Sequence, residues 1–139
     1  MISMKVYDAE NKVLGRLASQ VANEILDGEE IKVVNAEKIF IVGDKQNILE
    51  KYKQRRARGK QMNGPNFPRR PERIFKRSVR GMIPHQKPRG RKAFKRLHAY
   101  IGMPKEFEDE DITDPDVKDA AGKLGITLED VSEHLGAEF

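Results

Sequence analysis

The 139-residue sequence contains no cysteine and no tryptophan, and only 6% of its residues are aromatic. The absence of cysteine excludes disulfides, cysteine-ligated zinc and thiolate catalysis, and it is typical of a reducing cytosol. The scarcity of aromatic residues argues against a platform on which single-stranded bases stack. No apolar run approaches the ~18 residues that a membrane-spanning helix needs, and no apolar signal segment follows Lys5. We therefore expect a soluble, cytoplasmic protein.

Negative charge is almost missing from the middle of the chain. Residues 51–105, called the basic block below, hold 19 lysines and arginines and a single acid, Glu72, which gives a net charge of +18. The first 50 residues have a net charge of −3, and residues 106–139, with 12 acids, have a net charge of −10. Self-repulsion within the basic block opposes folding unless a polyanion neutralises it. Nucleic acid is the commonest such partner.

The first 43 residues have the pattern of a compact α/β unit. A strand is predicted at 5–7 and an amphipathic helix over 14–26, where apolar residues recur every three or four positions. Gly28 can take the left-handed conformation that ends such a helix. β-branched runs at 31–35 and 39–42 predict two further strands. Strand, helix and strand joined by short links imply a right-handed crossover and a parallel sheet.

Further elements are predicted in the basic block. Asp44 is the expected N-cap of a helix with an apolar stripe of Ile48, Leu49 and Tyr52. Residues 59–71 hold two glycines and three prolines, which predicts a loop. The pattern then predicts a helix over 72–82 after Pro71, a loop through Pro84, Pro88 and Gly90, a short helix over 91–97 and a strand at 99–101.

The acidic end of the chain carries one helix signal. Residues 127–130 (Thr-Leu-Glu-Asp) resemble a capping box, which predicts a short helix ending near Gly136. Its expected apolar anchors are Leu128, Val131 and Leu135. Acids repel RNA, so this segment either packs on its own domain or on a basic neighbour, or it folds back over the basic block and screens it. The apolar anchors favour packing.

One side of the predicted helix after Pro71 is entirely cationic. A solvated charged surface is the alternative to phosphate binding, but such surfaces usually mix signs, and only Glu72 is acidic here. We therefore predict that this cationic ridge binds phosphates. The ridge consists of Arg73, Lys76, Arg77 and Arg80 at i, i+3, i+4 and i+7, and the opposite, apolar side of Ile74, Phe75, Ser78, Val79 and Met82.

The other candidate residues lie where cations alternate with glycine or proline. Glycine lets a backbone approach phosphates closely, and proline limits the entropy lost on ordering. More than half of the cations in the basic block are arginines, which bind phosphate oxygens bidentately. Disordered basic linkers are the alternative. Beyond the ridge, the predicted RNA-binding residues are Arg55, Arg56, Arg58, Lys60, Arg69, Arg70, His85, Lys87, Arg89, Arg91, Lys92, Lys95 and Arg96.

The sequence contains no recognisable catalytic constellation. His85, His98 and His134 are far apart and lack the spacing of paired metal ligands, and no serine has a GxSxG context. Neither GxGxxG nor GxxxxGK[ST] occurs. We expect no catalytic residue, no metal and no cofactor, and a nucleotide-using enzyme is the weaker alternative.

Three ordered segments resemble one known family. Residues 13–19 (VLGRLAS), 33–39 (VVNAEKI) and 79–85 (VRGMIPH) are similar to large ribosomal subunit protein thirteen. Residues 64–67 (GPNF) and 71–75 (PERIF) resemble its archaeal and eukaryotic branch. The bacterial form differs by a histidine-glycine-tyrosine segment and a late His-Pro-His that this chain lacks. The likeness covers roughly residues 4–104, and the acidic tail matches only loosely.

The resemblance implies a three-layer α/β/α domain, residues 1–104, around a parallel sheet of about four strands. Basic helical and loop extensions would belong to this domain, and residues 105–139 would form an acidic tail with a short helix. It further implies a non-catalytic constituent of the cytoplasmic ribosome that binds large-subunit ribosomal RNA, contacts neighbouring ribosomal proteins and supports early assembly. Neither a membrane nor a small-molecule substrate is an expected partner. A free-standing RNA chaperone would have a similar charge map.

Overall fold

A parallel sheet forms the centre of the fold. The computed structural model describes residues 4–58, 69–107, 112–113, 115 and 124–137. The sheet is built on β4 (Leu97–Ala99), β2 (Glu30–Val34) and β1 (Met4–Asp8), and the two-residue β5 (Ile112–Thr113) extends it in the order β4-β2-β1-β5. All three pairings are parallel. The predicted α/β class with a parallel sheet is confirmed.

The crossover from β1 to β2 is the amphipathic helix α1 (Leu14–Leu26). Its buried side chains, Leu17, Ala18, Val21 and Ile25 among them, pack toward the sheet, as the helical spacing predicted. Asp27 caps the end of the helix, and Gly28 follows with a φ of +98°, a conformation that favours glycine.

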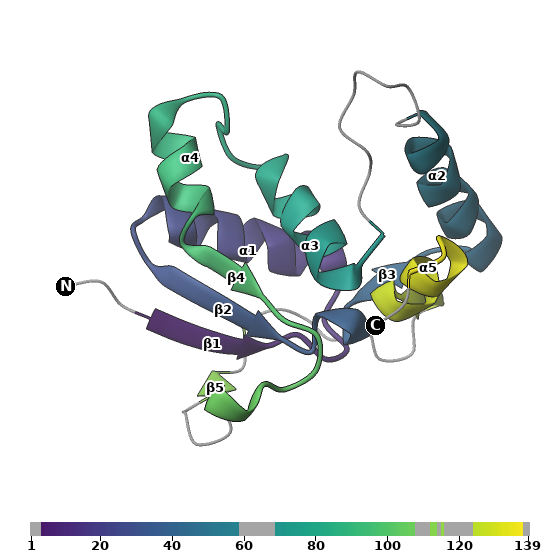
Figure 1. Cartoon of the computed structure of the whole chain (residues 1–139), viewed down its shortest axis with the longest axis horizontal. Coiled ribbons are helices and arrows are strands. Elements are labelled where there is room, and N and C mark those ends of the chain that lie inside the picture. Colours follow the sequence, from purple (N-terminus) through teal and green to yellow (C-terminus); the bar gives the residue numbers. More distant parts are fainter. Residues whose placement is uncertain (1–3, 59–68, 108–111, 114, 116–123, 138–139) are drawn as a thin grey trace.

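One side of the sheet is covered by α1, α3 (Pro71–Arg80) and α4 (Pro88–Phe94), which lie together above it in Figure 1. On the other side, Val6 and Val34 pack against Phe107 of η2 (Lys105–Phe107). Among the described residues this second side therefore carries a 3-10 turn rather than an α-helix. The three-layer arrangement stays a prediction.

A second, two-stranded sheet lies beside the parallel one. β3 (Phe40–Val42) follows the 3-10 turn η1 (Ala36–Lys38) and pairs antiparallel with β6 (Gly125–Thr127). The strand predicted at 39–42 exists, but it does not join the parallel sheet. α2 (Lys45–Arg58) follows, and Asp44 accepts hydrogen bonds from the backbone amides of Gln46 (2.8 Å) and Asn47 (3.5 Å), as expected of its N-cap.

The last helix, α5 (Leu128–His134), packs into the same core as α1 and α3. The capping box is confirmed, because the Thr127 side chain accepts from the Asp130 backbone and the Asp130 side chain accepts from the Thr127 backbone. Leu128 and Val131 are fully buried, and α5 contacts α2, α3 and η1. The yellow helix lies next to α2 and β3 in Figure 1.

After α3 a helix and a strand follow in the predicted order, but their predicted boundaries are wrong. α4 begins at Pro88, not at Arg91, and β4 begins at Leu97, so that Pro88 and Gly90 are helical rather than loop residues. Proline fits the first turn of a helix, where its missing N–H costs nothing. Gly90 is required because a Cβ there would lie 2.0 Å from the carbonyl oxygen of Pro84.

The helix predicted over 72–82 ends at Arg80, and Met82, expected on its apolar side, is 46% exposed. Within the described part of the chain, no helix is long and apolar enough to cross a membrane.

Candidate nucleic-acid interface

Helix α3 separates its apolar and cationic sides as predicted. Ile74, Phe75 and Val79 are buried against α1 and the rest of the core. On the other side Arg73 is exposed, and Lys76, Arg77 and Arg80 are half-buried. Burial of the apolar stripe therefore fixes the direction in which the cationic ridge points.

The turn after α3 and helix α4 continue this cationic surface. Gly90 and Ala93 are buried, and they turn one side of α4 toward the molecule. Because α4 contacts α1, its cations are carried on the same side of the sheet as those of α3 (Figure 1). The exposed cations of this segment are Lys87, Arg89, Arg91, Lys92 and Lys95.

The end of α3 and the turn that follows it form a pocket of about 500 Å³ that is open to solvent. Phe94 positions the His85 ring that lines the pocket, because the two rings meet in a T-shaped contact at 5.6 Å. The Lys76 ammonium lies 5.2 Å from the Phe94 centroid. None of the described residues that line the pocket is acidic. They are Arg77, Arg80, Gly81, Ile83, Pro84, His85, Gln86 and Lys87.

Other predicted RNA-binding residues lie outside this surface or outside the described residues. Arg69 and Arg70 are exposed just before α3, and the Arg70 Nε donates to the Glu72 carboxylate at 2.6 Å, which engages the single acid of the basic block. Arg55, Arg56 and Arg58 belong to the C-terminal half of α2, but their side chains lie outside the described part, as does Lys60.

Arg96 has a structural partner. Its Nη1 donates to the carbonyl oxygen of Ile25 at 2.7 Å, at the C-terminal end of α1, and its own carbonyl accepts from the Ile31 amide. A guanidinium at the end of a helix satisfies a free carbonyl and stabilises the helix dipole. The structure thus gives Arg96 a role in joining α1, β2 and β4, which the charge pattern did not indicate.

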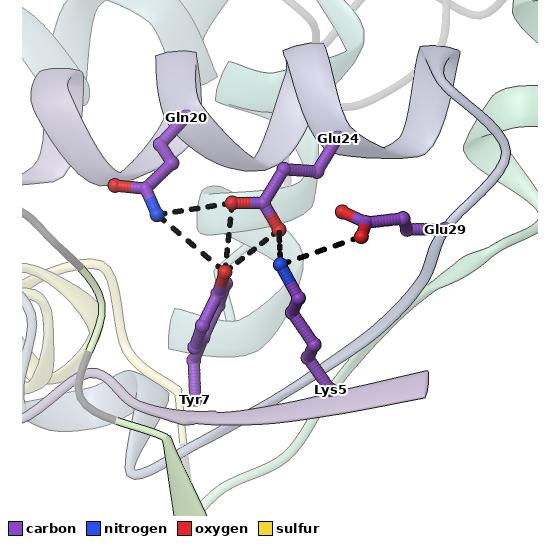
Figure 2. Close-up of polar contacts among 5 residues, drawn as sticks. All are labelled: Lys5, Tyr7, Gln20, Glu24 and Glu29. Carbon is purple, nitrogen blue, oxygen red and sulfur yellow. Dashed lines mark hydrogen bonds and ion pairs between the residues drawn. The ribbon is translucent and has the colours of Figure 1, made fainter. Parts of the chain in front are cut away.

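A second polar cluster fixes α1 on the sheet. Figure 2 shows Tyr7 and Lys5 of β1 pointing toward Glu24 of α1, with Gln20 beside it. The Tyr7 hydroxyl lies 2.7 Å from both Glu24 oxygens, and the Lys5 ammonium lies 3.7 Å from Glu24 and 3.3 Å from Glu29. Burial and the Glu24 carboxylate raise the pKa of Tyr7 to about 12. Burial acts to lower the pKa of Lys5, but Glu24 and its other partners raise it. These groups hold the scaffold together, and the cations of the interface lie elsewhere.

The segment 35–37 is likewise structural. Asn35, with a φ of +58°, donates its side-chain amide to Asp8 at 3.0 Å and its backbone amide to Gly102 at 2.9 Å. The buried Glu37 carboxylate accepts from the Gly102 amide at 2.9 Å. Sequence reasoning did not identify this anchor for the chain after β4. Its one signal was an acid and an asparagine set between two β-branched runs.

A family model and individual relatives agree in what this chain is similar to. The family described as "Ribosomal protein L13" matches residues 3–106. The chain is 52% identical over 139 residues to "Large ribosomal subunit protein uL13" of Methanopyrus kandleri, which covers 96% of this chain and 87% of the relative. The proteins of the same name from Methanocaldococcus jannaschii and Methanosarcina barkeri are 48% and 45% identical, and each alignment covers 98% of this chain and 100% of the relative.

Proposed function

Because the chain belongs to the ribosomal protein L13 family, we propose that it binds large-subunit ribosomal RNA as a structural constituent of the large ribosomal subunit. Its relatives are structural proteins of the ribosome. The chain is therefore a ribosomal protein of the cytoplasmic ribosome, with a role in translation, and it is not an enzyme.

The observation that carries the RNA-binding proposal is the cationic surface formed by α3, the following turn and α4. Burial of Ile74, Phe75 and Ala93 orients this surface away from the core. Lysine and arginine placed there release counterions from RNA and bring together RNA helices that would otherwise repel each other. Phosphates carry no sequence information, so recognition would depend on the shape of the RNA.

The further parts of the proposal concern assembly and neighbours. A protein that reduces repulsion between RNA helices helps them come together while the subunit forms, which supports a role in early assembly. The exposed acids of α5, such as Glu133, would face neighbouring basic ribosomal proteins rather than RNA, because like charges repel.

The binding proposal is tested by the salt dependence of affinity for large-subunit RNA. If about six phosphates are contacted, log K falls against log[salt] with a slope near −4 to −5, from ~0.7–0.9 per contact. A slope shallower than about −2 would contradict it. Sedimentation separates a ribosomal constituent from a free RNA chaperone, because only the constituent stays with large subunits at moderate salt.

A further inference from the structure

Gly81, which lines the pocket formed by the end of α3 and the turn after it, is a glycine that the fold itself does not need. Its φ is −68° and its ψ −12°, which is ordinary helical backbone open to any residue. A Cβ at this position would meet only the carbonyl oxygens of Ser78 and Arg77, at 3.6 and 3.9 Å, which are normal contacts. Gly90, nine positions later, is the opposite case, because a Cβ there would lie 2.0 Å from the Pro84 oxygen.

A glycine in right-handed helical backbone, as Gly81 is, loses more conformational entropy on folding than alanine would, a cost of roughly 0.5–1 kcal/mol in helix interiors. Gly81 has neither a left-handed backbone nor a crowded neighbour, and it lines the pocket, so we take its missing side chain to leave room there for a ligand. Glycine serves this purpose where a ligand must approach the backbone closely.

The lining of the pocket combines two kinds of surface. Arg80 and Lys87 supply positive charge, and guanidinium and ammonium groups bind phosphate oxygens. Ile83, Pro84 and the His85 ring supply apolar or flat surface, and histidine is one of the side chains on which unstacked RNA bases lie. The His85 ring is already positioned by its T-shaped contact with Phe94.

The size of the pocket also exceeds what a phosphate group requires. Its volume of about 500 Å³ lies within the ~300–1,000 Å³ that small organic ligands occupy. A phosphate alone would use the cationic side and leave the apolar side in contact with water.

We propose that this pocket holds one unstacked nucleotide of the bound RNA. Its phosphate lies toward Arg80 and Lys87, and its base lies against Pro84 and His85. The inference rests on the proposed function, because the nucleotide belongs to the RNA that the cationic surface binds. It adds that one RNA base leaves its stack to enter the protein.

The first test compares Gly81→Ala with Gly15→Ala in the full-length protein. Gly15 is exposed in the first turn of α1, away from the pocket, and a Cβ there would have no neighbour within 4 Å. Stacking of one base corresponds to roughly a five- to 160-fold change in affinity. We expect Gly81→Ala to weaken binding to large-subunit RNA by about tenfold, with an unchanged salt slope and an unchanged or higher melting temperature. Gly15→Ala should bind as the unmodified protein does.

The second test locates the nucleotide by chemical probing of the RNA with a reagent that acylates mobile 2′-hydroxyls and one that modifies free base edges. With the unmodified protein, one nucleotide should change its reactivity toward both reagents, and Gly81→Ala should abolish that change. Arg80→Ala should abolish it too. Arg91→Ala, which removes an exposed cation outside the pocket, should lower the salt slope but keep the signal.

Two results would overturn the inference while leaving the proposed function intact. In one, Gly81→Ala binds RNA as Gly15→Ala does. In the other, probing shows only protection of the RNA backbone and no altered base, which means that phosphates alone occupy the pocket. Failure of the proposed function looks different, because the unmodified protein would then show no preference for large-subunit RNA and a shallow salt slope.

Discussion

The phenol of Tyr7 should make the stability of the fold depend on alkaline pH. Its pKa is raised from 10.0 to about 12, first by burial and then by the Glu24 carboxylate. A group whose pKa rises on folding stabilises the protonated fold, so its contribution is complete below pH 10 and is lost as the pH rises through 12. This loss should amount to roughly 2–3 kcal/mol. Tyr7→Phe should remove it from denaturation curves measured across this range, whereas Tyr100→Phe should keep it.

Arg96 and Lys95 are adjacent cations for which we expect opposite effects. Arg96→Ala removes the hydrogen bond to the Ile25 carbonyl and should cost roughly 1–3 kcal/mol of unfolding free energy, with little effect on the salt slope of RNA binding. Lys95, exposed at the end of α4, should show the reverse. Urea denaturation and filter binding of both variants would decide. An Arg96→Ala protein of normal stability that binds RNA with a shallower slope would make Arg96 an RNA ligand after all.

The contrast between Arg96 and Lys95 shows that a charge pattern predicts a cationic region but not the role of each cation in it. Cations of one block look alike in sequence, and the pattern placed Arg96 with the others. Its structural role depends on Ile25, which lies 71 positions earlier in the sequence and comes close to Arg96 only in the folded chain. The contacts of Asn35 and Glu37 with Gly102 also join residues far apart in the sequence, so periodicity could not reveal them.

The two sides of helix α3 should have different roles, the apolar side in the stability of the fold and the cationic side in RNA binding. Phe75 is fully buried, and Phe75→Ala should cost roughly 3–5 kcal/mol of unfolding free energy. The double variant Arg73→Ala/Arg80→Ala should instead keep its melting temperature. It should lose about two phosphate contacts, which makes the slope of log K against log[salt] shallower by roughly 1.4–1.8. Calorimetry and binding titrations on the same preparations would compare them. The opposite distribution of effects would mean that the two sides of α3 are assigned the wrong way round.

At the scale of whole elements, apolar periodicity predicted the helices better than proline and glycine predicted the loops. The buried stripe of α1 and the N-terminal Pro71 of α3 follow directly from spacing and from proline geometry. Pro88 and Gly90 were interpreted as a loop, yet both are helical. The missing information was spatial, because Gly90 is needed only where α4 approaches the Pro84 carbonyl. A glycine that serves a close contact looks the same in sequence as one that ends an element.

For the molecule as a whole, the acidic end of the chain is the part that sequence placed least well. The capping box and its anchors were predictable, since they are local. The pairing of β6 with β3 joins residues more than 80 positions apart, and no local pattern specifies which strand a three-residue segment will meet. That pairing brings Leu128 and Val131 into the core and makes α5 part of the packed structure.

Two variants can therefore show whether the acidic end of the chain packs on the core or screens the basic block from RNA. Leu128→Ala/Val131→Ala keeps every acid but opens the core, and the leucine change alone should cost roughly 2–5 kcal/mol. Deletion of residues 108–139 removes 11 acids but spares the buried Phe107. Packing predicts that both variants are less stable and are incorporated poorly into large subunits. It also predicts that neither binds unrelated RNA more tightly at low salt than the unmodified protein. If the acids screen the basic block, the deletion should tighten that non-specific binding several-fold and the double variant should not, because only the deletion changes the charge.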